Sequence, residues 1–504
     1  MRSLSKSKLL AFRQCPKRLW LEVHRADLIE WSDQAQASFL VGHEVGEIAR
    51  DLYDPKGKGV VFEPKVEGYD EVVSRTAALI DAQRPLFEAG FNAGGARAYV
   101  DVLLPVRRKG QKVWRMVEVK SSADVKDTHR DDVAIQAYVA RASGLKLDSV
   151  ALAHIESQWV YPGGGDYQGL LKEVDLTDEA FGREEEVKGW IASAQTIVRK
   201  RKEPEIGVGR HCSDPYPCGF LDYCQRNADQ VEFPVTWLPG NKNNKLRNLI
   251  EVEGVSDLRQ VPDELLNPKQ LRVKTHTLGG SVYFNADGAA AELAQHKLPA
   301  LFLDFETINF AVPIWKGTRP FQQIPFQFSL HRLSRTGKLT HKEFIDLSGQ
   351  DPSRRFAEAL IAACGERGPI FVYSSFESNR IYELAKRFPK LARPLLAIDD
   401  RLVDLLPIAS EHYYHPDQQG RWSIKNLLPT IAPDLRYDEL DGVQDGGMAM
   451  MAYREAVHPE TTNSRQGQIR CQLSNYCRLD TQAMVRVWEY FQGGRILLLE
   501  IKTA

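Results

Sequence analysis

RAYVDVLLPVRRKGQKVWRMVEVKSS occupies residues 97–122 and decides the fold of the N-terminal part of the chain. Both ends of this stretch are rich in Val, Leu and aromatic residues, and RRKG at 107–110 has the composition of a hairpin turn. The segment DDVAIQAYVARASG at 131–144 has apolar residues at helical spacing and ends on a glycine, which predicts a helix that stops there. LDSVALAHI at 147–155 predicts a further strand. We therefore predict a mixed α/β fold for this region.

The composition indicates a folded, globular protein of several domains. At about 100 to 200 residues per domain, the 504 residues predict roughly three domains. Hydrophobic residues make up 43% and charged residues 26%, which excludes a collagen-like or largely disordered chain. The 66 Lys and Arg residues nearly balance the 67 Asp and Glu residues, so any surface that binds nucleic acid must be local.

The first twenty residues, MRSLSKSKLLAFRQCPKRLW, carry cationic side chains among the apolar ones. This pattern does not provide the apolar centre of a signal peptide. No stretch of the sequence approaches the ~18 apolar residues of a membrane-spanning helix. We therefore expect a cytoplasmic protein without membrane contact. Its cysteines would stay reduced, and such thiols more often bind metals or act in catalysis than form disulfides.

Two changes in composition divide the chain into three predicted domains. Near residue 230 the sequence becomes rich in Pro, Gly and Asn, and near residue 295 a polar segment gives way to the apolar run LPALFLDFET. We predict a first domain at 1–230, a small helical linker at 231–295 and a third domain at 296–504. Within the third domain, the patterns predict strands at 301–306, 324–333 and 369–375 and helices at 351–364, 423–431 and 473–491.

A first group of charged residues lies on the predicted hairpin. Asp101 interrupts an apolar strand, and Glu118 and Lys120 lie two apart on the partner strand, hence on one face. Buried carboxylates are costly unless a cation or hydrogen-bond donors compensate them. Asp101 and Glu118 could hold Mg²⁺ or Mn²⁺ while Lys120 orients a water and offsets charge on a phosphate. The alternative interpretation is an ordinary surface salt-bridge pattern.

VDV around Asp101, VEVKS around Glu118 and the following helix with Gln136 resemble the PD-(D/E)XK nuclease core, specifically its RecB-like branch. The resemblance implies a restriction-endonuclease-like fold, hydrolysis of DNA with metal ions, and a catalytic role for Gln136. The helical Tyr138 lies two residues from Gln136 rather than the four that are usual in the branch. GHEVGEIAR at 42–50 offers His43 and Glu47 as upstream ligands, with a surface histidine as the alternative.

Four of the seven cysteines form a second motif. The last three of them are spaced C-x5-C-x5-C, without the tight C-x2-4-C pairs of zinc sites, so the spacing favours an iron–sulfur cluster. One early and three late cysteines resemble the layout of iron–sulfur RecB-like nucleases, among them CRISPR-associated exonucleases. The resemblance spans residues 1 to about 228 and implies a structural [4Fe-4S] cluster; the alternative is four unlinked thiols. The predicted ligands are Cys15, Cys212, Cys218 and Cys224. The remaining cysteines, Cys364, Cys471 and Cys477, are interpreted as packing or surface residues.

A second acidic group begins in LFLDFET, where Asp304 and Glu306 lie two apart on an apolar strand and so share a face. Further acidic residues follow, and YCRLD places Tyr476 four residues before Asp480. The order and context resemble the DEDD exonucleases of the RNase H-like fold, in their tyrosine subtype. The resemblance implies two metal ions held by four acids, with the tyrosine orienting a water. The predicted site residues are Asp304, Glu306, Glu377, Tyr476 and Asp480, with Asp404 in a lesser role.

Two positions depart from the DEDD pattern. Glu377 follows Phe376 where the family has Asp, and Tyr373 lies where it has Asn. Glu ligates metals as Asp does but reaches one methylene further. DFET, GTRPFQQIPFQFSL at 317–330, YYHPD at 413–417 and VQDGG at 443–447 also resemble an uncharacterised bacterial family. Many members of that family carry an N-terminal RecB-like nuclease.

We predict a metal-dependent exonuclease with two sites that acts on DNA, preferably on single-stranded ends. In one alternative the C-terminal domain cuts RNA and the N-terminal domain positions the substrate. In another the protein binds nucleic acid without cutting it. The basic segments 199–202, 242–247 and 269–274 would contact phosphates or form solvated helix faces. The sequence leaves open the polarity of cleavage, the choice of Mg²⁺ or Mn²⁺, and the oligomeric state.

Overall fold

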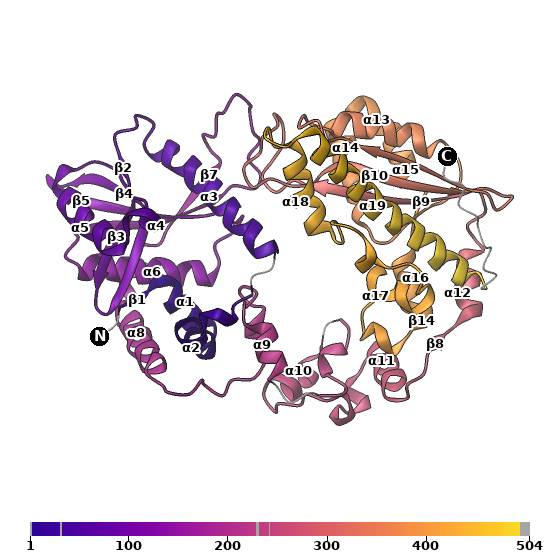
Figure 1. The fold of residues 1–504 in the computed structure, drawn as a ribbon, viewed down its shortest axis with the longest axis horizontal. Coiled ribbons are helices and arrows are strands. Elements are labelled where there is room, and N and C mark those ends of the chain that lie inside the picture. Colours follow the sequence, from indigo (N-terminus) through magenta and orange to yellow (C-terminus); the bar gives the residue numbers. More distant parts are fainter. Residues whose placement is uncertain (1–2, 31–32, 228–230, 241, 494–504) are drawn as a thin grey trace. The chain divides into compact units, whose positions relative to one another are not determined.

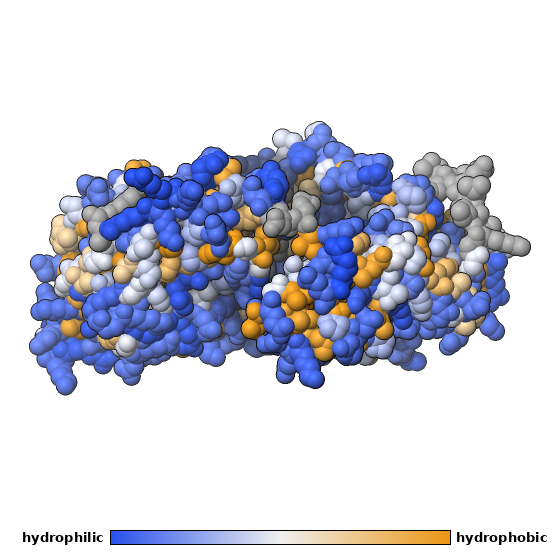
Figure 2. All heavy atoms as spheres, turned by 90° about the horizontal axis from the view of Figure 1, so that it is seen from below, coloured by the Kyte–Doolittle hydropathy of each residue, from blue (hydrophilic) through white to orange (hydrophobic). Residues whose placement is uncertain are grey.

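The structure is a computed structural model of mixed α/β class, with about 49% helix and 18% strand. The predicted fold class is confirmed at this level. None of the described helices is long and apolar enough to cross a membrane. The face seen in Figure 2 is mostly hydrophilic, with hydrophobic residues in separate small groups. The structure describes residues 3–30, 33–227, 231–240 and 242–493.

Contacts divide the chain into two compact units (Figure 1). The first comprises Met1–Asp229 and Phe310–Gln322, and the second comprises Gln230–Asn309 and Gln323–Ala504. The segment 231–295, which the sequence suggested as a linker, thus lies within the second unit. Residues 310–322 join the first unit through paired backbone hydrogen bonds of Tyr161, from its N to Thr318 O at 3.0 Å and from Gly317 N to its O at 2.8 Å.

The first unit is built on a mixed sheet. Its order is β2-β3-β4-β5-β6-β7, with β1 paired to β4, which makes seven strands in the described residues. The predicted hairpin is confirmed as β4 and β5, and its turn consists of Lys109 and Gly110 at φ values of 47° and 79°. Positive φ at both positions is the geometry that suits the twist of a two-residue hairpin. The strands are β1 Leu4–Ser5, β2 Val60–Val61, β3 Leu86–Ala93, β4 Ala96–Arg108, β5 Gln111–Lys120, β6 Leu147–Ile155 and β7 Leu171–Asp175.

Helix α6 (Asp127–Ala142) connects β5 to the parallel strand β6, as the sequence predicted. Parallel neighbours require such a crossover. The helix is buried at His129 and from Asp131 to Ala140, because the sheet covers one side and helices α1 and α8 cover another. Polar side chains of α6 in this range are therefore held away from water. The helices of the unit are α1 Lys6–Gln14, α2 Pro16–His24, α3 Asp33–Tyr53, α4 Pro64–Glu67, α5 Tyr69–Leu79, α6, α7 Thr177–Gly182, α8 Glu184–Val198 and α9 Leu221–Arg226.

The second unit contains a five-stranded sheet, in the described residues, of order β11-β10-β9-β12-β13. Strands β11, β10 and β9 are antiparallel, whereas β9, β12 and β13 are parallel. A short pair, β8 with β14, lies outside this sheet. The strands are β8 Tyr283–Phe284, β9 Ala300–Ile308, β10 Ile324–Leu333, β11 Leu339–Ile345, β12 Ile370–Val372, β13 Leu402–Asp404 and β14 Tyr413–Tyr414.

Helices cover both faces of the second sheet. Leu301 and Leu303 of β9 pack with α13, whereas Ala300 and Phe302 pack with the long helix α19. Alternation therefore directs Asp304 and Glu306 toward α19. The predicted strands and helices of this region are confirmed to within three residues at their ends, except that α19 begins at Asn463, ten residues before the predicted start. The helices are α10 Asn244–Glu251, α11 Pro268–Leu278, α12 Ala286–Leu293, α13 Ser353–Cys364, α14 Phe376–Arg387, α15 Ala392–Asp399, α16 Leu405–His412, α17 Ile424–Ile431, α18 Gly446–Val457 and α19 Asn463–Phe491.

Two candidate carboxylate sites and a cysteine group

The first site lies between strand β5 and helix α6, where three predicted residues meet. Glu118 and Lys120 share the face of β5 on which Trp114 and Met116 pack into the same core as α6. Lys120 Nζ donates to Glu118 Oε1 at 2.6 Å, and Gln136 Nε2 donates to Glu118 Oε2 at 2.6 Å. Alternation along β5 therefore placed Glu118 and Lys120 correctly on one face.

Asp101 approaches the same group from strand β4. Its Oδ2 accepts a hydrogen bond from the backbone N of Val119 at 2.8 Å. Burial raises the pKa of Asp101, while the ammonium group of Lys6 opposes that rise. Glu88 of β3 lies opposite Asp101, because the pairs on either side fix that register. Burial also raises the pKa of Glu88, so it is a further acidic group of this site.

Besides Glu88, two further members of the first site were not predicted, Lys6 and Asp132. Lys6 Nζ lies 2.9 Å from Glu118 Oε1 and 3.2 Å from Asp132 Oδ1. Asp132 also accepts a hydrogen bond from Lys120 at 2.5 Å and one from Gln136 at 2.9 Å. Asp132 precedes Gln136 by four residues on a buried helix, a spacing that could have indicated a shared face. Lys6 has no comparable signal in the sequence.

The charges of the first site are partly balanced by its own lysines. Burial, followed by repulsion from Asp101 and Asp132, raises the pKa of Glu118 to about 7. Burial also acts to raise the pKa of Asp132, but the attraction of Lys120 and Lys6 outweighs it and holds that pKa well below its ordinary range.

The donors of the first site are carboxylate oxygens of the kind that Mg²⁺ and Mn²⁺ take. Gln136 Oε1 is also buried, with no hydrogen-bond partner among the described residues. The residues therefore fit a hard divalent cation, although two ammonium groups already offset part of the charge.

Other residues suggested around this site lie elsewhere. His43 and Glu47 are exposed on α3, and Glu47 forms an ion pair with Arg50 at 3.6 Å. No hydrogen bond joins His43 to the buried acids within the described residues. Tyr138 packs in the core against Gly94, where a Cβ atom would clash with the Tyr138 ring and hydroxyl. The basic run at 199–202 is exposed at the end of α8.

The four cysteines predicted as ligands line one small cavity of the first unit. Cys15 lies between α1 and α2, and the other three come from the segment that leads into α9. All four are free thiols. Lys17 and Arg18 line the same cavity. Four converging thiols with cationic neighbours are a donor set that fits an iron–sulfur cluster.

Local contacts hold the cysteine segment against the N-terminal helices. Gln14 Nε2 donates to the backbone O of His211 and of Tyr216, each at 2.7 Å. Cys218 N donates to Cys212 O at 2.8 Å. Burial raises the pKa of Cys218, with nearby cationic and thiol groups as smaller influences. The two ends of the domain are therefore joined around the thiols even in the protein alone.

The second site lies between strand β9 and helix α19. Asp304, Glu306 and Cys477 each offer a ligand atom, and these atoms lie within 4.8 Å of one another. Asp480 is one turn of α19 beyond Cys477, and its Oδ1 accepts a hydrogen bond from Tyr437 Oη at 2.6 Å. Asp304 and Glu306 therefore share a face, as predicted, and meet side chains of α19.

All four carboxyl groups of the second site have raised pKa values, whereas Asp132 of the first site has a lowered one. Burial, followed by repulsion from Asp480, holds the pKa values of Asp304 and Glu306 well above their ordinary range. Burial raises the pKa of Asp480 to about 6 and that of Glu377 to about 8. Glu377 Oε2 is buried without a hydrogen-bond partner in the described residues. Four clustered carboxylates with an unpartnered oxygen fit hard divalent cations.

Two aromatic hydroxyls and one lysine border these acids. Tyr476, predicted for the site, is 5% exposed, and its hydrogen bond to Asp480 lowers the pKa of that carboxyl. The ammonium of Lys425 lies 5.1 Å from the ring centres of both Tyr437 and Tyr476. Its positive charge opposes the rise that burial causes in the pKa values of Glu306 and Asp480. Neither Lys425 nor Tyr437 was predicted, because neither belongs to the motifs that identified the acids.

Asp404 and Tyr373, the other two residues considered with the acidic pattern, each form a hydrogen bond to the backbone. Asp404 caps helix α16 by accepting a hydrogen bond from Leu406 N at 2.9 Å, and its charge raises the pKa of Glu377. Tyr373 Oη donates to the backbone O of Trp422 at 2.8 Å. Asp404 therefore lies beside the acids with one oxygen already engaged.

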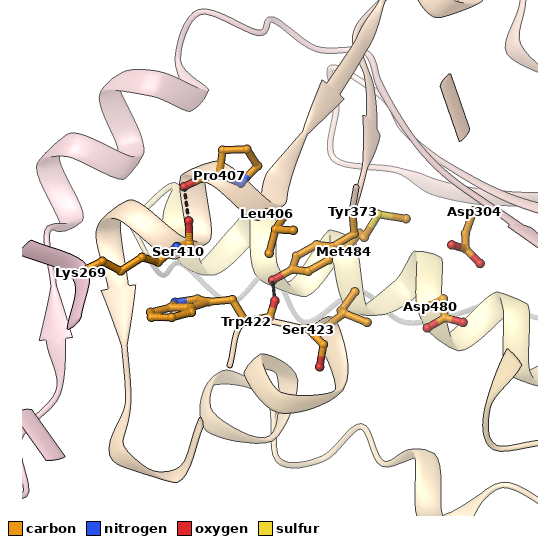
Figure 3. Close-up of a pocket in the computed structure, with 11 residues that line it drawn as sticks. Lys269, Asp304, Tyr373, Leu406, Pro407, Ser410, Trp422, Ser423, Asp480 and Met484 are labelled. Atoms are coloured by element: carbon orange, nitrogen blue, oxygen red, sulfur yellow. Dashed lines mark hydrogen bonds between the residues drawn. The ribbon is translucent and has the colours of Figure 1, made fainter. Parts of the chain in front are cut away.

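A cavity of about 750 Å³ opens beside Asp304 and Asp480 (Figure 3). Lys269 lies at its other end, with its ammonium 4.5 Å from the ring centre of Trp422. The walls between these ends are mostly aromatic and apolar. The remaining lining residues are Tyr373, Leu406, Pro407, Ser410, Ser423, Ile424 and Met484.

Residues 301–423 match a family described as a domain of unknown function, DUF2779. The matched segment contains Asp304, Glu306, Glu377 and Asp404 but ends before Tyr476 and Asp480. No curated protein matches the chain.

Proposed function

We propose that the protein is a cytoplasmic, metal-dependent nuclease that hydrolyses phosphodiester bonds of DNA, with a site in each unit. The observation that carries this proposal is the second site, where burial raises the pKa values of four clustered acidic side chains, two of which, Asp304 and Asp480, line one cavity. Such a group is costly in a protein alone and is stabilised by divalent cations. When bound, these ions would activate a water and stabilise charge on the leaving oxygen.

The arrangement of strands supports the same proposal. In the second unit, three antiparallel strands are followed by two parallel ones, with the acidic strand β9 at the centre. This is the arrangement of an RNase H-like sheet. In the first unit, the antiparallel strands β3, β4 and β5 are followed by α6 and the parallel strand β6, as in a PD-(D/E)XK core. Both assignments are proposals that rest on strand order and on the position of the acids.

The chain's own residues have definite tasks in the proposed reaction. Asp304, Glu306, Glu377 and Asp480 would hold the ions of the second site, and Tyr476 would orient a water beside them. In the first site, Asp101 and Glu118 would hold the ion. There Lys120 would face the phosphate and Gln136 would position Glu118 through its 2.6 Å hydrogen bond. By the same reasoning, the four cysteines would hold a structural [4Fe-4S] cluster.

DNA is the proposed substrate, and single-stranded ends are its preferred form. The cavity beside Asp304 combines aromatic walls with one cationic end, and single strands bind to stacking platforms with nearby cations. RNA offers the same chemistry, so the two polymers are compared directly in the experiment below.

The test is a cleavage assay on single-stranded DNA and RNA labelled separately at each end, with Mg²⁺ or Mn²⁺. We expect Lys120→Ala and Asp304→Ala each to remove a distinct set of DNA products. Lys112→Ala and Asp287→Ala, which change exposed residues of the same two units, serve as matched controls and should leave both sets intact. A wild type that cuts neither polymer with either metal would refute the proposal. Loss of RNA cleavage alone in Asp304→Ala would favour an RNA exonuclease.

A further inference from the structure

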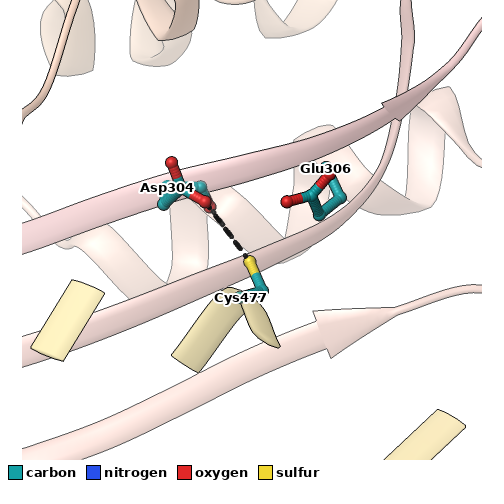
Figure 4. A group of neighbouring side chains, drawn as sticks. All are labelled: Asp304, Glu306 and Cys477. Carbon is teal, nitrogen blue, oxygen red and sulfur yellow. Dashed lines mark hydrogen bonds between the residues drawn. The ribbon is translucent and has the colours of Figure 1, made fainter. Parts of the chain in front are cut away.

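Cys477 lies among charged groups rather than in an apolar core. Its side chain is fully buried, and Sγ lies 3.6 Å from Asp304 Oδ2 and 3.8 Å from the backbone O of the same residue (Figure 4). By contrast, the buried Cys364 packs among the apolar side chains between α13 and the sheet. A buried cysteine usually acts as a small hydrophobic residue. Packing alone therefore does not account for the surroundings of Cys477.

Three donors converge at this point from two elements. Asp304 and Glu306 project from β9, and Cys477 projects from the facing side of α19. Their ligand atoms lie within 4.8 Å of one another. Glu377 belongs to the same acidic group, and its buried oxygen without a hydrogen-bond partner in the described residues is an independent observation in favour of a cation there.

The observed spacing suits a small tetrahedral ion. With Zn–S and Zn–O bonds of about 2.3 Å and 2.0 Å, a tetrahedral angle separates the sulfur from the oxygen by about 3.5 Å. The distance between Cys477 Sγ and Asp304 Oδ2 is 3.6 Å. The ligand atom of Glu306 lies within 4.8 Å of both atoms, which makes Glu306 the candidate third ligand. Mg²⁺ prefers oxygen ligands, whereas thiolates select softer ions such as Zn²⁺.

We propose that Cys477, Asp304 and Glu306 form a binding site for a thiophilic divalent cation such as Zn²⁺. Binding forms a bond from the sulfur to the ion and releases the thiol proton to solvent. Asp304 and Asp480 line the cavity of Figure 3, so the ion reaches the site from that side. Because it shares Asp304 and Glu306 with the proposed nuclease site, the thiophilic ion competes with Mg²⁺ or Mn²⁺ there. Only this competition rests on the proposed function.

The test of ion binding uses Co²⁺ as a spectroscopic probe on the full-length protein. We expect the wild type to show a sulfur-to-cobalt charge-transfer band that Cys477→Ser lacks. The band is read from the difference spectrum of wild type minus Cys477→Ser, because the four-cysteine cavity is the same in both proteins and its absorption cancels. Cys471→Ser, which changes an exposed cysteine of the same helix, is the matched control and should retain the band. Identical spectra for wild type and Cys477→Ser would overturn the inference.

Asp304→Asn keeps the test decisive if Cys477→Ser fails to fold. This variant retains the thiol and should weaken Co²⁺ binding by about tenfold or more. Unchanged affinity in this variant would overturn the shared site.

A second measurement titrates Zn²⁺ into the Mn²⁺-supported cleavage reaction. Cys477→Ser should need about tenfold more Zn²⁺ for the same inhibition than Cys471→Ser does. Equal sensitivity of the two variants would overturn the competition. A protein that binds Co²⁺ through Cys477 but cuts no nucleic acid would refute only the proposed nuclease function.

Discussion

Lys6 Nζ lies 2.9 Å from Glu118 Oε1, although 112 residues separate them in the sequence. The contact joins the first turn of α1 to the end of β5, in the middle of the first acidic site. Burial lowers the pKa of Lys6, but the attraction of Asp132 and Glu118 outweighs this effect and raises it overall. Lys6 is therefore a fixed cation of the site and bears on the stability of the unit.

Lys6→Met should destabilise the first unit. The substitution keeps the aliphatic stem but removes a charged partner from Glu118, whose side chain is 1% exposed. Leaving a buried charged group with one partner fewer costs about 2 kcal/mol, reduced here because Lys120 remains. Urea unfolding at neutral pH measures the change. Lys112→Met, at the exposed start of β5, is the matched control, and an equal effect of both substitutions would contradict the assigned role of Lys6.

The free energy of unfolding should depend on pH, because the carboxyl groups of the second site have raised pKa values. Burial raises the pKa values of Asp480 and Glu377 from 3.8 and 4.5 to about 6 and about 8. Between the ordinary and the raised pKa of each group, the folded protein binds more protons than the unfolded chain, so the free energy of unfolding falls as pH rises. The slope is about 1.4 kcal/mol per pH unit for each carboxyl group that titrates. Unfolding in the presence of a chelator, from about pH 5 to about pH 8, measures it.

Glu377→Gln provides the control for this pH dependence. The amide has nearly the same shape but does not titrate, so the fall in stability should be shallower in the variant, most clearly in the upper half of the range. Saturating Mn²⁺ should reduce the fall in the wild type, because a bound cation favours the charged carboxylates. A slope that neither Glu377→Gln nor Mn²⁺ alters would show that other groups cause it.

Four acids of the two sites could be predicted from local pattern because each interrupts an apolar strand. Asp101, Glu118, Asp304 and Glu306 stand in strands that are otherwise hydrophobic, and alternation alone decides which of them share a face. The same rule holds over the few residues of one strand and its hairpin partner. Local pattern is therefore sufficient where the site lies on consecutive elements.

Residues that join a site from distant segments could not be predicted in this way. Lys6 stands among other cationic residues near the N-terminus, and nothing local marks which of them meets Glu118. Lys425 lies in the predicted helix at 423–431 and Tyr437 follows that helix, and nothing local indicates that either meets the acids of β9 and α19. Cys477 was interpreted as a packing or surface residue, because its contact with Asp304 depends on the tertiary fold and no local pattern indicates it. Long-range contacts of this kind are not encoded in spacing.

Cys218→Ser should abolish the proposed iron–sulfur cluster. Four thiols line one cavity, and three cannot complete the same set of ligands. We expect iron, acid-labile sulfide and visible absorption to fall to background in protein purified without oxygen, together with lower thermal stability of the first unit. Cys471→Ser is the control for the loss of one thiol. Wild-type protein that carries zinc in place of iron, or equal iron in wild type and Cys218→Ser, would contradict the cluster.

Lys269→Ala should weaken binding of single-stranded DNA without altering the acidic site. Lys269 stands at the end of the cavity opposite Asp304, and burial lowers its pKa. If its ammonium contacts one phosphate, the substitution should reduce the slope of log affinity against log salt by about 0.7. Fluorescence anisotropy at several salt concentrations measures this slope, with Lys120→Ala and Asp304→Ala both in the background to prevent cleavage at either proposed site. Lys269→Arg should retain the slope, as should Lys390→Ala at an exposed position of the same unit. An unchanged slope in Lys269→Ala would place the path of the strand outside this cavity, because loss of a phosphate contact cannot leave the salt dependence unaltered.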